Sequence, residues 1–269
     1  MNLESALRTA QRKKRPARAP VGPRRDTVIQ FGRNPKLLGM GEFWRVHAAD
    51  MRRKGERTWT PVAVKLPKRH KEKRVAQLMG AELAARRAYQ HHPHVLNIHH
   101  WHRGQPGSYM VIERARGSMR DEIKAGAYRE RRILIQDISH VLEALYGVHI
   151  QGNVYGDLRP ANALVFGRPY KKGDERALRD HLDQRVLKLA DFQFHVKIEE
   201  GERQRIRGVR KGASGSSCYV VRHPESTRFG PHWDLYGVGV ILYEIISGRR
   251  LHQKARVSQK DLNRLRDDP

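Results

Sequence analysis

The sequence has 269 residues, which is enough for one large hydrophobic core or two modest ones. Hydrophobic residues make up 38% of it and charged residues 30%, so we expect a packed domain with polar insertions. The 54 Lys and Arg residues outnumber the 28 Asp and Glu residues, which gives a formal net charge of +26. This charge favours acidic partners, such as acidic proteins, nucleic acid, anionic lipid or nucleotide polyphosphates.

The single cysteine, Cys218, excludes a disulfide within the chain and is typical of a protein from a reducing compartment. No apolar run reaches the roughly 18 to 20 residues that a membrane-spanning helix needs. The first residues also lack the apolar core of a secretory signal. We therefore expect an intracellular protein, cytoplasmic or nuclear, without a transmembrane segment.

Residues 1–26 are rich in Arg and Pro and contain few large apolar side chains. Ordering such a segment costs conformational entropy that burial does not offset, so we expect a disordered basic tail. A tail of this kind can serve in nuclear localisation, contact nucleic acid or act as a transit peptide, or it can simply be solvated. The sequence leaves these alternatives open.

From Thr27 onward the pattern predicts strands. Residues 37–46 form an expected strand, turn and strand that contain Gly39 and Gly41. Because glycine has no Cβ, the backbone of such a turn can approach a ligand closely.

The next expected strand, residues 61–66, is apolar except for Lys65. A buried lysine is costly unless it is paired, so this position indicates a specific anionic partner. We expect a helix at about residues 74–90 and then a strand followed by a connecting segment at residues 108–115.

In residues 131–149 apolar side chains recur at helical spacing, which predicts an amphipathic core helix. The following loop carries Asp157, Arg159 and Asn162 and runs directly into an apolar strand. A loop of this kind can hold a carboxylate at a substrate hydroxyl, an amide oxygen at a magnesium ion and a guanidinium at a phosphate.

Five further segments follow. We expect a strand at residues 164–166, a polar insertion at 167–185, a second strand that ends in Asp191-Phe192-Gln193, and a basic loop from 194 to 223. A last helix is expected at residues 233–248, where Gly248 would cap its C-terminus.

These segments resemble, in order, the motifs of eukaryotic-type protein kinases. The resemblance covers residues 30–250 and includes the glycine-rich loop, the strand lysine, the catalytic loop, an Asp-Phe-Gln in place of Asp-Phe-Gly, a His-Pro-Glu close to Ala-Pro-Glu, and the helix after it. It implies an α+β, bilobal fold with a small β-rich N-lobe at residues 27–115 and a mainly helical C-lobe at 116–269. This C-lobe would lack its last helices. Either the chain is a fragment, or the shortened lobe leaves apolar surface that a partner would cover.

The resemblance also implies ATP and Mg²⁺ as cofactors and assigns the residues that would use them. The implied catalytic residues are Asp157 as the base, Lys65 paired with Glu82, and Arg159 as a phosphate contact. The implied magnesium ligands are Asn162 and Asp191. The implied nucleotide-binding residues are Gly39, Gly41, Val46, Ala63, Lys65, Ile112, Glu113, Ala115 and Leu164.

The sequence departs from the family pattern at several positions. Trp44 stands where the third glycine of the glycine-rich loop is usual, and Gln193 replaces the last glycine of Asp-Phe-Gly. Tyr155 and Gly156 replace the usual His and Arg before the catalytic aspartate. Without that arginine, an active enzyme would need no phosphorylation of its activation loop.

The expected function is phosphorylation of Ser or Thr hydroxyls on protein substrates, with the charge favouring acidic ones. Two alternatives stay open. The first is a pseudokinase that binds nucleotide or acts as a scaffold. The second is a small-molecule kinase of the aminoglycoside and choline kinase type, because residues 156–158 together with Asn162 resemble its Gly-Asp loop. Tyrosine as the acceptor also stays open, since Arg159 replaces the lysine that is common in serine/threonine kinases.

Overall fold

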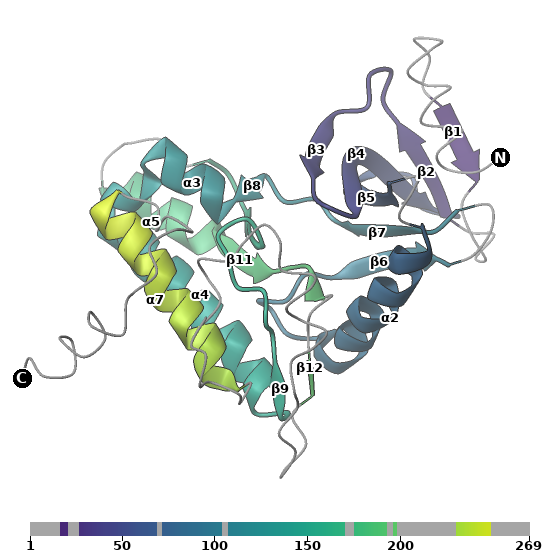
Figure 1. Cartoon of the computed structure of the whole chain (residues 1–269). Coiled ribbons are helices and arrows are strands. Elements are labelled where there is room, and N and C mark those ends of the chain that lie inside the picture. Colours follow the sequence, from purple (N-terminus) through teal and green to yellow (C-terminus); the bar gives the residue numbers. More distant parts are fainter. Residues whose placement is uncertain are drawn as a thin grey trace, which may run out of the picture.

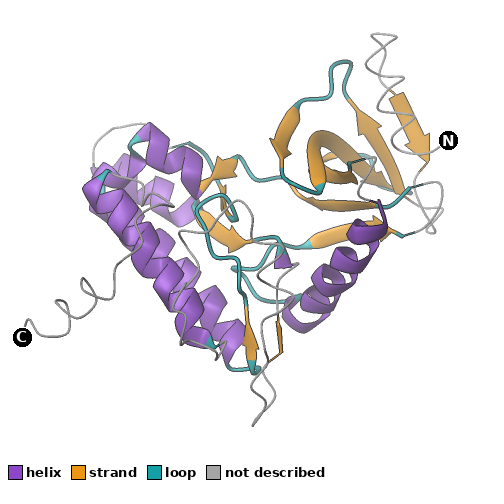
Figure 2. Ribbon diagram, viewed as in Figure 1, coloured by secondary structure: helices purple, strands orange, loops and turns teal. Residues whose placement is uncertain are grey.

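The computed structural model separates into a curled sheet with one helix beside it and a second part made mainly of helices (Figure 1). Figure 2 shows the same separation by secondary structure, with most strands on one side and most helices on the other. The structure describes residues 17–20, 27–68, 72–103, 107–169, 175–192, 196–197 and 230–248.

The N-terminal part contains an antiparallel seven-stranded sheet. Its main path is β1-β2-β4-β5-β7-β6, and β3 pairs with β4. The strands are β1 (Ala17–Pro20), β2 (Thr27–Phe31), β3 (Leu37–Met40), β4 (Trp44–Arg53), β5 (Thr60–Pro67), β6 (Ile98–His102) and β7 (Tyr109–Glu113).

Strand β5 shows how the sheet separates two cores. Because successive side chains of a strand point to opposite faces, Val62 and Val64 join one buried cluster while Ala63 joins the other. Lys65 is therefore on the face of Ala63, which is the face that helix α2 (Glu72–Tyr89) covers. The expected helix at residues 74–90 is confirmed with a start two residues earlier.

The C-terminal part packs around α4 (Arg131–His149), whose bounds match the sequence prediction. Buried residues recur about every four positions along this helix. Its buried apolar side chains belong to the largest core cluster. The other helices are α3 (Met119–Ala125), the 3₁₀ helix η2 (Ala127–Arg129), α5 (Glu175–Gln184) and α7 (Pro231–Ser247). Short strands complete this part: β8 (Gly117–Ser118), β9 (Asn153–Val154), β10 (Ala163–Phe166), β11 (Val186–Leu189) and β12 (Val196–Lys197).

Helix α7 begins and ends at residues that favour helix termini. Pro231 occupies its first turn, where a missing N–H costs nothing. Gly248 follows its last residue with a φ of 64°, a left-handed conformation that glycine adopts readily. The predicted cap at Gly248 is thus confirmed.

Two differences from the sequence predictions concern local structure. The polar insertion at residues 167–185 contains helix α5, whose Leu178 is buried in the C-terminal core. A segment with so few apolar residues gives a weak helical signal, and its tertiary contact with the core stabilises it. Within the basic tail, β1 pairs with β2, because backbone hydrogen bonds need no apolar side chains. The remaining residues of that tail lie outside the described part.

The predicted α+β, bilobal fold class is confirmed by this arrangement. The lobe boundaries stay a prediction. So does the absence of the last C-lobe helices, because the structure describes no residue after Gly248. No helix in the described ranges combines the length and the hydropathy that crossing a membrane requires.

Candidate active site

A cleft of about 700 Å³ lies where the sheet meets the helical part. Its walls come from β3 to β5, from the segment after β7, and from the loop between β9 and β10. Every residue that the sequence predicts for nucleotide or metal binding lines this cleft, as do Asp157 and Arg159. Glu82 is the exception among the predicted site residues, because it lies on α2 and reaches the cleft through Lys65.

Lys65, on β5 of the sheet, forms ion pairs with a carboxylate of helix α2 and with Asp191, which follows β11. Its Nζ donates to Glu82 Oε1 at 2.8 Å and Oε2 at 2.9 Å, and to Asp191 Oδ1 at 3.2 Å. Burial lowers the pKa of the Lys65 ammonium, but the carboxylates of Asp191 and Glu82 outweigh this effect and raise the pKa to about 12. The lysine is therefore charged at neutral pH and held at the cleft wall.

Asp157 and Asn162 are held together within the catalytic loop. Asn162 Nδ2 donates to Asp157 Oδ2 at 2.7 Å and to the Asp157 carbonyl oxygen at 3.0 Å. Arg159 Nε lies 3.6 Å from the same carboxylate oxygen. Because the amide nitrogen of Asn162 faces Asp157, its amide oxygen is the atom that can bind a cation.

The pKa of Asp157 is raised to about 7. Burial is the main cause of the raised pKa, since it disfavours the charged carboxylate. The Asp191 carboxylate raises the pKa further. The positive charge of Arg159 and the hydrogen bond from Asn162 both lower it. A carboxylate with a pKa near neutrality is a far better proton acceptor than an ordinary exposed aspartate.

This pKa predicts how activity depends on pH. If the Asp157 carboxylate accepts a proton, kcat/KM rises with pH and has its midpoint near pH 7, because only the deprotonated form acts as a base. The Arg159→Met variant loses a cation that lowers this pKa, so its midpoint moves to higher pH. Steady-state rates from pH 5.5 to 9 measure both midpoints, and a rate that stays constant over this range would contradict the assignment.

The catalytic loop is anchored from below by Asp234 of helix α7. Its carboxylate accepts hydrogen bonds from the backbone N–H groups of Tyr155 and Gly156, each at 2.9 Å. These two hydrogen bonds fix the loop backbone at the two residues that precede Asp157. The same carboxylate lies 2.8 Å from His149 Nε2. The contact with His149 is one that sequence reasoning missed, since the two residues are far apart in the chain.

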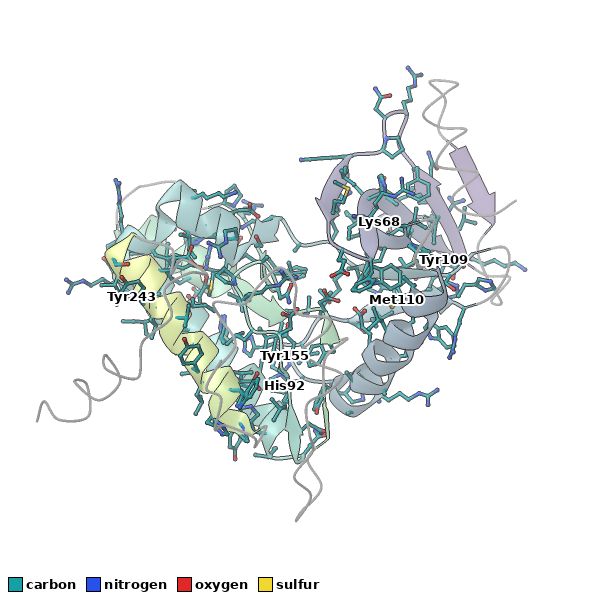
Figure 3. All side chains as sticks on the ribbon, viewed as in Figure 1. Lys68, His92, Tyr109, Met110, Tyr155 and Tyr243 are labelled. Carbon is teal, nitrogen blue, oxygen red and sulfur yellow. The ribbon has the colours of Figure 1, made fainter. Side chains whose placement is uncertain are left out.

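The Tyr-Gly pair that departs from the family pattern has a structural role. Gly156 has a φ of 79°, a conformation that a side chain disfavours and glycine adopts without strain. Tyr155, labelled in Figure 3, is fully buried and donates its hydroxyl hydrogen to the Ala190 carbonyl. Its ring meets that of Phe192 edge-on at 4.9 Å between centroids. The tyrosine thus connects the catalytic loop to the segment that precedes Asp191.

Asp191 is brought beside Asn162 by the backbone. Ala190 N donates to the Asn162 carbonyl oxygen at 2.9 Å, so the two predicted metal ligands belong to adjacent segments. Asp191 has a φ of 65°, a left-handed conformation that aspartate tolerates better than most residues and that is common at functional sites.

These oxygen donors suit a hard divalent cation such as Mg²⁺. One or two carboxylates together with phosphate oxygens are the usual ligands of Mg²⁺ in proteins. Across the described ranges, no group of three or more His, Cys, Asp or Glu side chains is placed to hold a metal ion. A site formed by Asn162 and Asp191 therefore needs further ligands from substrate and water, as a nucleotide site does.

Several residues line the cleft that sequence reasoning did not select. Arg116 lies between β7 and β8 and Arg120 lies in α3, and both are paired with carboxylates. Arg116 contacts Glu122 through both terminal nitrogens, and Arg120 bonds Glu244 of helix α7. Nothing in their spacing distinguishes them from the many other arginines of this basic chain.

Comparison with known families decides the identity of this fold. The sequence matches the family model of the protein kinase domain over residues 33–267. The chain belongs to the protein kinase family. The kinase resemblance that the motifs carry is therefore confirmed.

The similar curated proteins are serine/threonine and calcium-dependent protein kinases. Calcium-dependent protein kinase 26 of Oryza sativa subsp. japonica is 25% identical over 223 residues, which cover 79% of this kinase chain and 36% of that protein. Serine/threonine-protein kinase PEPKR2 of Arabidopsis thaliana is 25% identical over 227 residues, which cover 83% and 40% respectively. Serine/threonine-protein kinase dkf-2 of Caenorhabditis briggsae is 29% identical over 220 residues, which cover 79% and 16%. This kinase chain thus spans about two fifths or less of the length of these relatives.

Proposed function

We propose that this protein kinase domain transfers the γ-phosphoryl group of ATP to Ser or Thr hydroxyls of proteins. The observation that carries the proposal is the convergence of Asp157, Asn162, Asp191 and Lys65 on one cleft, although they come from three separate segments. The names of the similar proteins support Ser and Thr as acceptors.

Each charged residue has a role that its surroundings support. Asp157, with a pKa of about 7, orients the acceptor hydroxyl and takes its proton. Lys65, held by Glu82 and Asp191, places a permanent positive charge where phosphate oxygens bind. Arg159 lies at the same wall of the cleft and neutralises charge on the transferred group.

Asn162 and Asp191 would hold Mg²⁺, which neutralises charge on the phosphates when it is bound. The apolar side chains of Val46, Ala63 and Leu164 line the cleft and would enclose the adenine ring. Glu113 and Ala115 lie at the segment that joins the two parts of the molecule and would offer backbone groups to that ring. Ile112 also lines the cleft and would close its rear, and Gly39 and Gly41 line it from β3 and the turn after it.

The test is transfer of labelled γ-phosphate from Mg-ATP to a mixture of proteins. The wild-type chain is expected to label proteins on Ser and Thr, and both EDTA and the Asp191→Asn substitution should abolish the label. Phosphoamino-acid analysis distinguishes Ser and Thr from Tyr. Nucleotide binding without transfer would instead indicate a pseudokinase, and labelling of aminoglycosides or choline but not of proteins would indicate a small-molecule kinase.

The glycine at position 156 predicts that activity does not depend on activation-loop phosphorylation. The family's arginine at this position grips a phosphorylated loop, but Gly156 has no side chain that could do so. We therefore expect the same transfer rate before and after phosphatase treatment of the purified chain. A rate that falls with the loss of a phosphate and returns on rephosphorylation would refute this prediction.

The basic tail and the preference for acidic substrates stay predictions that rest on charge alone. A steep fall of nucleic-acid affinity with salt concentration would support contact through the tail.

A further inference from the structure

Trp44 is the residue at which this kinase departs most from the glycine-rich loop of its family. It is the first residue of strand β4, it lines the nucleotide cleft, and its side chain is only 4% exposed. A glycine at this position would leave the volume of an indole ring empty. The structure therefore places a large side chain between the cleft and the interior of the sheet domain.

The indole packs in the cluster that attaches helix α2 to the sheet. This cluster contains Trp44, the first residue of β4, and Phe43 before it, together with Val75, Leu78 and Met79 from α2. Glu82, the carboxylate that pairs with Lys65, lies on the same helix. Trp44 and the helix that carries Glu82 thus belong to one packed apolar cluster.

The ring also faces the ammonium group of Lys65. The Lys65 Nζ lies 5.1 Å from the centroid of the Trp44 ring, within the range of a cation–π interaction. Lys65 is only 5% exposed, so little solvent weakens this attraction. The ammonium is accordingly held by two carboxylates and by an aromatic face.

The indole N–H does not contribute to this arrangement. Trp44 Nε1 is buried and has no hydrogen-bond partner among the described residues. The ring is therefore held by packing and by the lysine, and a phenyl ring could replace it without loss of a hydrogen bond.

We propose that Trp44 is a positioning residue that holds α2 against the sheet and keeps Lys65 paired with Glu82 before nucleotide binds. Only the consequence of this proposal rests on the proposed function. That consequence is that the catalytic lysine is already in place without phosphorylation of the activation loop.

The test uses the whole chain and two readouts that need no phosphoryl transfer. Hydrogen exchange of the α2 amides, relative to those of β5, reports how firmly the helix is held. Acylation of Lys65, followed by peptide mapping, reports how well its ammonium is kept in the pair. The Trp44→Gly variant should accelerate both by about tenfold or more, since it removes the packing and the aromatic face.

Two conservative variants separate the parts of the contact. Trp44→Phe keeps a ring over Lys65 and should leave both rates as in wild type. Trp44→Leu keeps apolar contact with α2 but removes the aromatic face, so the acylation of Lys65 should rise by about three- to tenfold while α2 exchange changes less. These two variants also keep the test informative if Trp44→Gly does not fold.

The matched control is Phe31→Leu, a buried aromatic in the other core cluster of the same sheet. It should lower the melting temperature without accelerating α2 exchange relative to β5. The proposal is overturned if Phe31→Leu and Trp44→Leu give the same pattern, or if Trp44→Phe behaves like Trp44→Gly. A chain that transfers no phosphate would refute the proposed function and leave the two rates as the test of Trp44.

Discussion

Replacing Asp157 with asparagine should lower kcat for phosphoryl transfer by about 10²- to 10⁴-fold, the usual contribution of a positioned general base. The change preserves the size of the side chain and removes its ability to accept a proton at neutral pH. Asp157 is buried, and the Asp234 carboxylate braces the loop backbone independently. The variant should therefore fold as wild type and bind nucleotide with similar affinity, with the loss confined to kcat.

The measurement is the initial rate of transfer at saturating Mg-ATP, accompanied by the dissociation constant of a non-hydrolysable ATP analogue. The matched control is Asp180→Asn, the same chemical change on the exposed face of helix α5. It should keep the wild-type rate. More than a tenth of wild-type kcat in the Asp157→Asn variant would show that this carboxylate is not the base.

Replacing Arg185 with methionine should lower the free energy of unfolding by about 3–5 kcal/mol, which is typical when one partner of a buried ion pair is removed. Arg185 is only 1% exposed. Its Nε and Nη2 each lie 2.7 Å from an Asp137 carboxylate oxygen, and its Nη1 lies 3.0 Å from Glu122 Oε2. Methionine would leave the Asp137 carboxylate buried without a cation, while Glu122 would keep only its pair with Arg116.

Three variants test the origin of this loss by chemical denaturation. Arg185→Lys should be intermediate, because an ammonium cannot reproduce the forked contact with both oxygens of Asp137. Arg185→Met combined with Asp137→Asn should recover part of the stability, since the uncompensated charge of Asp137 is gone. Arg132→Met should cost far less, because its pair with Glu175 lies at the surface. Equal losses for Arg185→Met and Arg132→Met would contradict the importance of burial.

The fold and most of the candidate site could be predicted because they depend on short, contiguous patterns. The long helix α4 follows from apolar residues at helical spacing, and its predicted bounds agree with the structure. Asp157, Arg159 and Asn162 lie within six positions of one another, so a single loop brings them together whatever surrounds it. Helix α5 was missed because its few apolar residues favour a helix only once the core is there to receive Leu178.

The sequence alone determined the kinase family, the order of the elements and the residue types of the catalytic loop. The way in which distant groups act on one another follows from the tertiary structure. Lys65 meets Glu82 across 17 positions and Asp191 across 126, and the pKa of Asp157 rises to about 7 because packing removes it from water. In the sequence, Trp44 is only a residue that replaces the third glycine of the loop. Its contact with Lys65 exists only in the folded chain. Distances and burial belong to the packed molecule, and electrostatic interactions depend on both.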